Sequence, residues 1–273
     1  MALLGAVTAP DLHVMTLNVR RRLRWTPRRS DRWSARAPLV RALLAAERPD
    51  LLAAQEVLPD QAAHLGAALG DGYRRVGYGR EVGRRGEATP LFYDSARLEL
   101  LAWAQRALSD RPDDAGSRTW GNPIPRVFVE AVLRDRETHA EFFVIATHFD
   151  VFSARARHAS AAAVRERIAA QSRPAVVLGD LNDGPASTTV RTLVGSGSLT
   201  DAWIAARERL TPEWGTYGGY RRPRRGRRID HILTSPEIDV RSIGIRARPA
   251  SGPWPSDHFP VQAVLRMPAA VPE

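Results

Sequence analysis

Six short apolar segments of this 273-residue chain are each bordered at one end by carboxylate, amide or imidazole side chains. A single Asp or Asn beside a strand is commonly a turn former or a helix cap. Six such borders along one chain are harder to explain in that way, because strand ends in α/β proteins gather in one crevice. We therefore expect convergence of the bordering residues, which are Asn18, Glu56, His148 with Asp150, Asp180 with Asn182, Asp230, and Asp257 with His258.

The apolar segments mix β-branched and large residues, a pattern typical of strands buried on at least one face. The predicted strands are His13–Leu17, Leu51–Gln55, Pro90–Tyr93, Val127–Leu133, Glu141–Thr147, Ala175–Leu178, Ile229–Leu233, Val240–Ile245 and Val261–Leu265. Apolar stripes at helical spacing predict helices at Trp33–Leu44, Ala62–Leu69 and Ala161–Ile168, with a further helix at Ser187–Val194. Hairpin-like neighbours mixed with strand–helix–strand units predict an α/β fold of mixed sheets flanked by helices. The Arg- and Pro-rich stretches are predicted loops, at Arg20–Arg36 and Tyr220–Arg228.

The side-chain types at the strand ends match the needs of phosphate ester hydrolysis. The chain has no cysteine, so a metal site would use oxygen or imidazole ligands. Glu56 and Asp257 are hard oxygen ligands suited to Mg²⁺, with Mn²⁺ as a substitute. Asp180 can accept a proton from an attacking water. His258, held by Asp230, can stabilise a phosphate oxygen.

Two amide side chains complete this set of candidate site residues. The motifs of serine-nucleophile chemistry and of nucleoside triphosphate binding are missing from the sequence. Asn18 and Asn182 can orient reacting groups without adding charge. The chain has no Gly-x-Ser-x-Gly elbow for a serine nucleophile and no P-loop for a nucleoside triphosphate. Metal-assisted hydrolysis of a phosphate ester is therefore the predicted chemistry.

The order of these motifs resembles that of the endonuclease/exonuclease/phosphatase superfamily. The motifs are MTLNVR, AAQE ending at Glu56, THFD from Thr147, GDLND from Gly179, RRIDHIL around Asp230 and SDHFPV from Ser256. The superfamily includes deoxyribonuclease I-like nucleases, apurinic-site endonucleases, sphingomyelinases, inositol polyphosphate phosphatases and deadenylases. The resemblance spans nearly the whole chain and implies a four-layer α/β sandwich. In that fold two mixed β-sheets pack face to face, helices lie outside, and the site lies at one edge.

The resemblance also implies roles for individual residues. Asn18 and Glu56 would lie at the metal, with Asp257 close to it. Asp180 would orient or deprotonate the attacking water, assisted by Asn182.

The two histidines of these motifs have implied roles as well. His258 would contact the scissile phosphate and pair with Asp230. His148 takes a position where some members have His and others Tyr, and it would act on the phosphate or the leaving group. Asp150, two residues further along the same motif, is a candidate for substrate binding.

A bacterial branch of the superfamily is similar in a further stretch, YRRVGYGREVGRRGEATPLFY, which carries a Gly-Glu pair before a Phe-Tyr strand. Glu87 of this pair is a candidate site residue, and the alternative is a salt bridge to Arg84 or Arg85. Thr216 and Tyr217, in GTYGGYRR, match a family stretch that often lines the pocket. They are candidate substrate-binding residues too.

The formal net charge is +10, and every basic residue other than histidine is arginine. A GC-rich genome produces such a composition whatever the function, so the placement of the arginines carries more information. Eight lie between Arg20 and Arg36, directly after Asn18, and six lie between Arg221 and Arg228. If the site converges, both segments border one crevice and attract a polyanionic substrate. Arg227 is a candidate contact, and the alternative is two solvated surface loops.

A single domain is expected over residues 10–268, with flexible ends at 1–9 and 269–273, since no linker or repeat is visible. No signal peptide or transmembrane stretch is recognisable, which favours a cytoplasmic protein. A monomer is favoured. The expected partner is an anionic, phosphate-containing substrate, and nucleic acid is included among the candidates.

Three functions remain open from the sequence. The first is a metal-dependent phosphomonoesterase or phosphodiesterase acting on a small or lipid-derived phosphate, as the compact loops and the bacterial branch indicate. The second is a nuclease on DNA or RNA, as the Arg-rich segments indicate. The third, a non-catalytic binding protein on the same fold, is disfavoured because every motif residue needed for catalysis is present.

Overall fold

The computed structural model describes residues 2–248 and 253–269. Apolar residues alternate along its central strands, and this alternation divides the buried core into layers. In the strand Glu141–His148 (β7), Phe142 and Val144 face a cluster that lies between two sheets. Phe143 and Ile145 point the other way, into a second cluster beneath a helical layer. A strand with both faces buried must lie inside a layered sandwich.

The described residues form two mixed β-sheets. The first has the strand order β10-β12-β13-β1-β2-β4-β3, with these bounds: β1 Asp11–Asn18, β2 Leu51–Gln55, β3 Tyr73–Val76, β4 Leu91–Asp94, β10 Glu208–Arg209, β12 Asp239–Ile245 and β13 Val261–Arg266. The second has the order β5-β6-β7-β8-β11-β9, with these bounds: β5 Leu98–Ala107, β6 Val127–Asp135, β8 Ala175–Asp180, β9 Thr200–Asp201 and β11 Asp230–Thr234. The pairs β1–β2, β7–β8 and β10–β12 are parallel and the other pairs are antiparallel, so both sheets are mixed as predicted.

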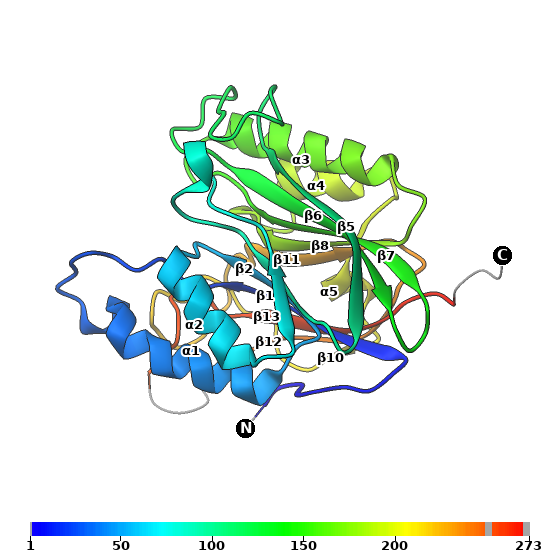
Figure 1. The fold of residues 1–273 in the computed structure, drawn as a ribbon, viewed down its shortest axis with the longest axis horizontal. Helices are drawn as coiled ribbons and strands as arrows, with labels where there is room; N and C mark the ends of the chain where they lie inside the picture. The colour runs from blue at the N-terminus through cyan, green and yellow to red at the C-terminus, as the bar shows by residue number, and fades with distance from the viewer. Residues whose placement is uncertain (1, 249–252, 270–273) are drawn as a thin grey trace.

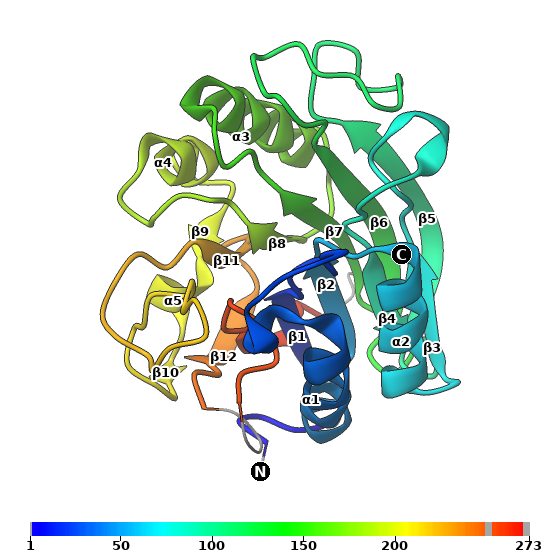
Figure 2. The same ribbon diagram turned by 90° about the vertical axis from the view of Figure 1, so that its left-hand side faces the viewer.

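Helices cover the outer faces of both sheets, and Figure 1 shows the sheets stacked between them. Figure 2, turned by 90°, shows the same two helical layers on opposite sides. The helices are α1 Trp33–Glu47 and α2 Pro59–Leu69 on the first sheet, α3 Ala154–Ala169 and α4 Thr188–Val194 on the second, and the short α5 Ala202–Ala205. The predicted four-layer α/β sandwich is confirmed.

The predicted helical stripes pack as expected. Val40 and Leu44 of α1 are buried against the first sheet, and Val164 of α3 is buried against the second. Ser187 precedes α4, and its side chain accepts a hydrogen bond from the backbone N–H of Val190 at 3.2 Å. This is the N-terminal cap expected from the Ser and Thr residues of that segment.

The predicted list of elements was incomplete. The strands β3, β5, β9 and β10 and the short helix α5 were missed, and β5 is an edge strand whose middle residues are exposed. The stretch Arg20–Arg36 is a loop only in its first part, since a 3-10 helix covers Arg29–Asp31 and α1 begins at Trp33. A sequence rich in Arg and Pro resembles a loop, but Trp33 and the residues after it bury an apolar face that favours a helix.

Part of the predicted flexible N-terminal segment is anchored. The backbone N–H groups of Leu3, Leu4 and Gly5 donate to the carboxylate of Glu47, at the end of α1. Residue 1 and residues 270–273 lie outside the described residues, so flexibility of the two ends stays a prediction, as do the domain boundaries. Across the described ranges, no helix combines the length and apolarity needed to cross a bilayer.

Candidate active site

The strand registers bring the predicted polar residues to one edge of the sandwich. In the second sheet, Asp180 at the end of β8 lies directly opposite His148 of β7 and Asp230 of β11. In the first sheet, Asn18 ends β1, and its Nδ2 donates across to Asp180 Oδ2 at 3.0 Å. Residues that are far apart in the sequence therefore meet where the two sheets face each other.

Asp180 lies at the centre of this group. Its Oδ1 accepts a hydrogen bond from the backbone N–H of Asn182 at 2.9 Å, while Oδ2 accepts the one from Asn18. Burial and the nearby charge of Asp230 raise the pKa of Asp180 to about 7. A carboxyl group with a pKa near neutrality can accept a proton from water at physiological pH.

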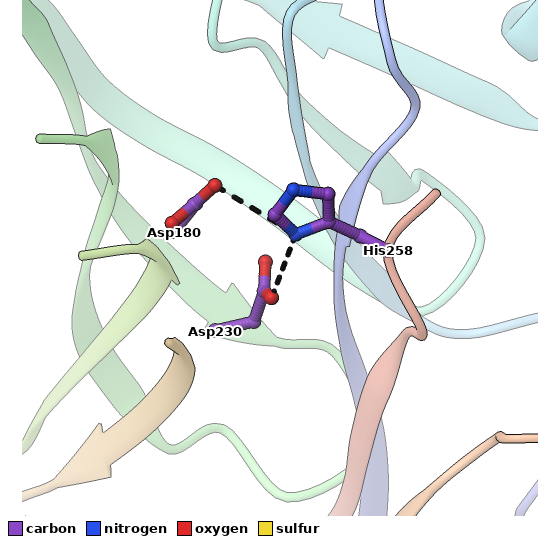
Figure 3. Close-up of side chains that lie close together, drawn as sticks. All are labelled: Asp180, Asp230 and His258. Atoms are coloured by element: carbon purple, nitrogen blue, oxygen red, sulfur yellow. Dashed lines mark hydrogen bonds and ion pairs between the residues drawn. The ribbon is translucent and has the colours of Figure 1, made fainter. Parts of the chain in front are cut away.

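His258 and Asp230 form a buried pair beside Asp180. The Nδ1 of His258 lies 2.9 Å from Asp230 Oδ2 and 3.8 Å from Asp180 Oδ2, as Figure 3 shows. Burial alone lowers the pKa of His258, but the charges of Asp230 and Asp180 outweigh it and raise this pKa well above its ordinary value. One ligand-type atom from each of the three residues lies within 4.8 Å of the others. The geometry places a protonated imidazole next to a carboxylate base.

Glu56 follows β2 with an unusual backbone conformation. Its φ is 61°, in the left-handed region that few non-glycine residues adopt. Its carboxylate is fixed by two donors, Asn18 Nδ2 at 3.1 Å and the backbone N–H of Arg21 at 3.0 Å. Burial opposes ionisation, but the N–H of Arg21 and the charge of His258 lower the pKa of Glu56. Residues held in such a strained backbone conformation cluster at functional sites.

Glu56 and Asp257 face a common cation, the guanidinium of Arg20. Arg20 Nη1 lies 4.0 Å from Glu56 Oε2, and Arg20 Nε lies 3.7 Å from Asp257 Oδ2. Two carboxylates directed at one position are the hard oxygen donors that Mg²⁺ and Mn²⁺ use, with water as the remaining ligands. The residues present therefore fit a divalent cation, and Glu56 and Asp257 would hold it.

The side chain of Asn18 makes hydrogen bonds that differ from the contacts of a metal ligand. Its Nδ2 bridges Glu56 and Asp180, and its Oδ1 accepts the backbone N–H of Arg20 at 2.9 Å. An amide nitrogen does not coordinate a hard cation. The observed hydrogen bonds are those of a residue that orients both carboxylates, and metal ligation by Asn18 stays a prediction.

His148 is buried on the other side of Asp180, with its Nε2 3.7 Å from Asp180 Oδ2. Burial lowers the pKa of His148 well below its usual value, and the charges of Arg126 and Arg80 add to this effect. The imidazole is therefore neutral at pH 7.

A cavity of about 660 Å³ opens over these residues. The predicted site residues on its wall are Glu56, Glu87, His148, Asp180, Asn182, Tyr217, Arg227, Asp257 and His258. Nine of the described arginines also line it: Arg20, Arg21, Arg80, Arg126, Arg157, Arg222, Arg224, Arg225 and Arg227. Both Arg-rich segments contribute to this wall, so the predicted common crevice exists.

Several predicted substrate residues have other contacts. Asp150 is fully buried and is absent from the described cavity wall; its Oδ1 accepts from the N–H groups of Phe152 and Ser153, and its Oδ2 pairs with Arg126. Thr216 is buried too, and its hydroxyl accepts from the N–H groups of Ile229 and Asp230. These two residues position the cavity wall instead of lining it.

Two predicted site residues that line the cavity, Glu87 and Tyr217, have specific contacts. Glu87 pairs with Arg21 at 2.8 Å and with Arg80 at 2.9 Å, and the predicted salt-bridge partners Arg84 and Arg85 are not among its described ion pairs. Tyr217 is 59% exposed, and its ring lies edge-on to His258 with the centroids 5.2 Å apart. Both side chains line the cavity, and Tyr217 lies against His258.

Some arginines of the two segments are structural. Arg36 is buried in α1, and its guanidinium donates to the carbonyl oxygens of Val19 and Arg20, which fixes the start of the loop after β1. Arg228 is buried as well and pairs with Asp201 at 2.6 Å and Glu213 at 3.2 Å. Neither the predicted attraction of a polyanionic substrate nor the alternative of a solvated surface loop describes these two buried residues.

Three cavity arginines were not predicted from the sequence, namely Arg80, Arg126 and Arg157. Arg80 lies in the same stretch as Glu87, and Arg126 directly precedes β6. Arg126 could have been predicted in the same way as the acidic residues, because it borders an apolar strand. Arg157 lies inside α3, and its sequence position gives no comparable signal.

Comparison with known proteins agrees with this architecture. The sequence model of the Endonuclease/Exonuclease/phosphatase family matches residues 15–258. No curated protein sequence matches the chain. A family structure from Bacteroides vulgatus is 31% identical, with a TM-score of 0.86 over 94% of this chain and 99% of that one. A mannosyl-6-phosphatase from Bacteroides thetaiotaomicron is 28% identical, with a TM-score of 0.86 over 93% and 99%.

A more distant structure shares the fold alone. The catalytic domain of human nocturnin, solved with a bound sulfate, is 20% identical, with a TM-score of 0.70 over 95% of this chain and 94% of that one. The family model covers most of the chain, and the predicted site residues from Asn18 to His258 lie inside the matched range. This chain belongs to the endonuclease/exonuclease/phosphatase family.

Proposed function

We propose that this protein is a divalent-metal-dependent phosphatase that hydrolyses a small, polar phosphate monoester. Family members are generally phosphoester hydrolases. The observation that carries the proposal is the buried group of Asp180, His258 and Asp230, of which Asp180 and His258 line a cavity of about 660 Å³. That volume is typical of pockets for small molecules.

The chemistry follows from the positions of the side chains. Asp180, with its pKa near 7, accepts the proton of the attacking water, and Asn182 and Asn18 fix the direction of its carboxylate. His258, kept protonated by Asp230, donates a hydrogen bond to a phosphate oxygen as negative charge develops.

Glu56 and Asp257 hold the metal in this proposal. A bound Mg²⁺ or Mn²⁺ supplies positive charge that polarises the phosphate ester. Hydrogen bonds from Asn18 and from the backbone N–H of Arg21 keep Glu56 ionised and ready for that role.

The walls of the cavity support a small substrate. Arg222, Arg224 and Arg225 approach from one loop, and Val151 and Phe152 approach from another. Apolar and cationic groups in one cavity suit a compact molecule that carries a ring and a phosphate. The similarity to a mannosyl-6-phosphatase over nearly the full length of both chains supports the same class.

A nuclease is the second candidate, and specific side chains favour it. Nine described arginines line the cavity, and Tyr217 and Phe152 are 59% and 69% exposed on its wall. Exposed aromatic rings beside cationic groups can stack on bases and contact a phosphate backbone. A strand needs an open groove, however, so the two candidates differ in the substrate length that they accept.

A substrate panel separates these functions. Sugar monophosphates, a chromogenic phosphodiester, and single-stranded and duplex DNA are assayed with Mg²⁺, with Mn²⁺ and with a chelator. We expect metal-dependent release of phosphate from sugar monophosphates. Faster turnover of DNA, with a steep loss of rate as salt rises, would support the nuclease instead. If no substrate is turned over with either metal, the non-catalytic binding protein becomes the better description.

A further inference from the structure

Three large hydrophobic side chains line the cavity and are strongly exposed in it. Val151 is 50% exposed, Phe152 69% and Tyr217 59%. Single exposed apolar residues are common on protein surfaces and need no special explanation. Inside a cavity that nine described arginines also line, the side chains of Val151 and Phe152 are different, because they offer a phosphate group neither charge nor a hydrogen bond. They indicate contact with the carbon skeleton of a ligand.

Val151 and Phe152 lie in the turn that joins β7 to α3. Ile124, from the segment before β6, lines the same cavity and is only partly buried. The two segments are neighbours, since a Cβ added to Gly121 would lie 4.0 Å from Ser153 Oγ. We refer to the side chains of Val151, Phe152 and Ile124 as the apolar patch.

The turn that carries Val151 and Phe152 is fixed from inside the protein. Asp150 is fully buried, and its Oδ1 accepts hydrogen bonds from the backbone N–H groups of Phe152 and Ser153 at 2.9 Å and 2.7 Å. The guanidinium of Arg157 donates to the carbonyl oxygens of Asp150 and Val151 at 3.0 Å and 3.3 Å. A turn whose backbone donors and acceptors are both held keeps its side chains in place before a ligand binds.

The segment that carries Ile124 is held by hydrogen bonds as well. The side chain of Asn122 donates from Nδ2 to the carbonyl oxygen of Ile124 at 2.8 Å. The guanidinium of Arg118 donates to the carbonyl oxygen of Pro123. Both parts of the apolar patch are therefore preformed, so a ligand that fits the patch binds without the entropic cost of ordering a loop.

The apolar patch is distinct from the groups that act on the phosphate. In the proposed function those groups are Asp180, His258 and the cation held by Glu56 and Asp257. None of the three side chains of the patch carries a charge or a hydrogen-bonding atom. The patch can therefore contribute only by removing apolar surface of the substrate from water, and that surface belongs to the alcohol part of a phosphate ester.

We propose that Val151, Phe152 and Ile124 form a subsite for the alcohol part of the substrate, and that this alcohol carries a ring with an apolar face. The assignment rests on the proposed phosphatase function and makes it more specific. A ring packs flat against an aromatic side chain, whereas an open chain loses more conformational freedom when it binds there. Phe152, the most exposed side chain of the patch, is then the main determinant of specificity for a ring.

Matched pairs of phosphate monoesters test the subsite. Glucose 6-phosphate is compared with sorbitol 6-phosphate, which has the same number of carbon atoms and no ring. Benzyl phosphate is compared with ethyl phosphate, because both release a primary alcohol. We expect kcat/KM at saturating Mg²⁺ to favour at least one ring-bearing member by about tenfold or more, a difference within the usual range of a stacking contact. The first pair reports a sugar ring on the patch, and the second reports an aromatic ring.

The variant Phe152→Ala should lower this preference by about fivefold or more. The loss should appear in KM and not in kcat, because the contact exists both before and during the reaction. The control is Ile204→Ala, which shortens a side chain that is 68% exposed and lies outside the described cavity wall. It should leave the ratio of the two kcat/KM values within about twofold of wild type. Thermal melting verifies folding, and Phe152→Leu, which keeps an apolar side chain without the ring, replaces Phe152→Ala if the latter is unfolded.

The outcomes separate the two proposals. If no phosphate ester is hydrolysed with any metal, the proposed function fails, and the subsite fails with it. If monoesters are hydrolysed and neither ring-bearing member is preferred, the subsite is wrong and the function stands. A preference that Phe152→Ala leaves unchanged, or that Phe152→Ala and Ile204→Ala reduce equally, would also overturn the subsite.

Discussion

At the scale of single residues, the site depends on two acids that share one imidazolium. Asp180 and Asp230 both lie within 4 Å of His258 Nδ1, and all three side chains are buried. If His258 lost its charge, the two carboxylates would repel each other in a poorly solvated environment. The protonated imidazole therefore keeps Asp180 available as a base while it stays ready to donate to the phosphate.

The first prediction concerns the two reacting residues. Asp180→Asn and His258→Ala should each lower kcat by at least about a hundredfold, the usual size of acid–base and oxyanion contributions. The readout is phosphate release from the best substrate of the panel, with circular dichroism to verify folding. A rate within tenfold of wild type in either folded variant would disprove the role assigned to that residue.

The second prediction is the pH dependence of kcat/KM. The base form of Asp180 is the carboxylate, and its pKa is raised from 3.8 to about 7. As the pH falls below about 7, Asp180 becomes protonated, so activity should fall about tenfold per pH unit and level off above about pH 7.5. Assays at saturating metal separate this loss from weaker metal binding. Full activity maintained down to pH 5 would contradict the raised pKa.

The third prediction concerns Arg20, which faces the two carboxylates proposed to hold the metal. Arg20→Ala removes a competing cation, so Mn²⁺ should bind more tightly by about fivefold, close to 1 kcal/mol. Isothermal titration calorimetry measures the dissociation constant without any substrate. Arg22→Ala is the matched control, because Arg22 pairs with the exposed Asp60 at 2.8 Å. Weaker Mn²⁺ binding by Arg20→Ala would show that Arg20 supports the metal site.

At the scale of elements, the ion pairs of the buried Arg228 hold the loop that precedes β11. Arg228 is 1% exposed and pairs with Asp201 beside α5 and with Glu213, and it also contacts His231. The cavity residues that follow Arg221 depend on this anchor for their position.

The fourth prediction follows from that anchor. Arg228→Ala leaves Asp201 buried without its partner, so the free energy of unfolding should fall by about 3–5 kcal/mol. Arg227→Ala, the exposed neighbour, should change it by less than about 0.5 kcal/mol. Urea denaturation of the three proteins provides the comparison. Equal losses for both variants would mean that Arg228 is no more structural than its neighbour.

The central strands with both faces buried were all predicted from the sequence. The segments of β7 and β8 read as continuous apolar runs because they are covered by a sheet on one face and a helix on the other. The strand β5 was missed because it lies at an edge with exposed middle residues, and its sequence alternates poorly. Edge strands obtain their structure from pairing with a neighbour, which a single sequence does not show.

At the scale of the whole molecule, the sequence predicted which residues converge and that His258 pairs with Asp230, but it did not predict the other pairings. The positions of Asn18, Asp180 and His258 beside apolar runs were sufficient to place them at one edge. The bridge of Glu87 to Arg21 and Arg80 depends on loop conformations, and these are set by backbone contacts between distant segments. Charge pairing among many arginines has no local signature in the sequence.

The fifth prediction concerns the contribution of His231 to stability in acid. Burial lowers the pKa of His231 from 6.5 to about 4. Between pH 6.5 and pH 4 the unfolded chain therefore binds a proton at His231 that the folded chain does not bind, so this contribution falls by about 2 kcal/mol between pH 7 and pH 5. Asp180, whose pKa is raised to about 7, contributes with the opposite sign, so wild type is compared with His231→Gln by denaturant titration at both pH values. The change in the free energy of unfolding from pH 7 to pH 5 should differ between the two proteins by about 2 kcal/mol, and an equal change in both would refute the prediction.

The hydrogen bond from Asn18 to Asp180 joins the two sheets at the point where the chemistry occurs. The residues of the proposed site are thus divided between two sheets, and the apolar side chains packed between the sheets set their alignment. Shortening one of these side chains, for example with Val144→Ala, would let the sheets shift relative to each other. The catalytic rate of this protein therefore depends on how well its interior is packed.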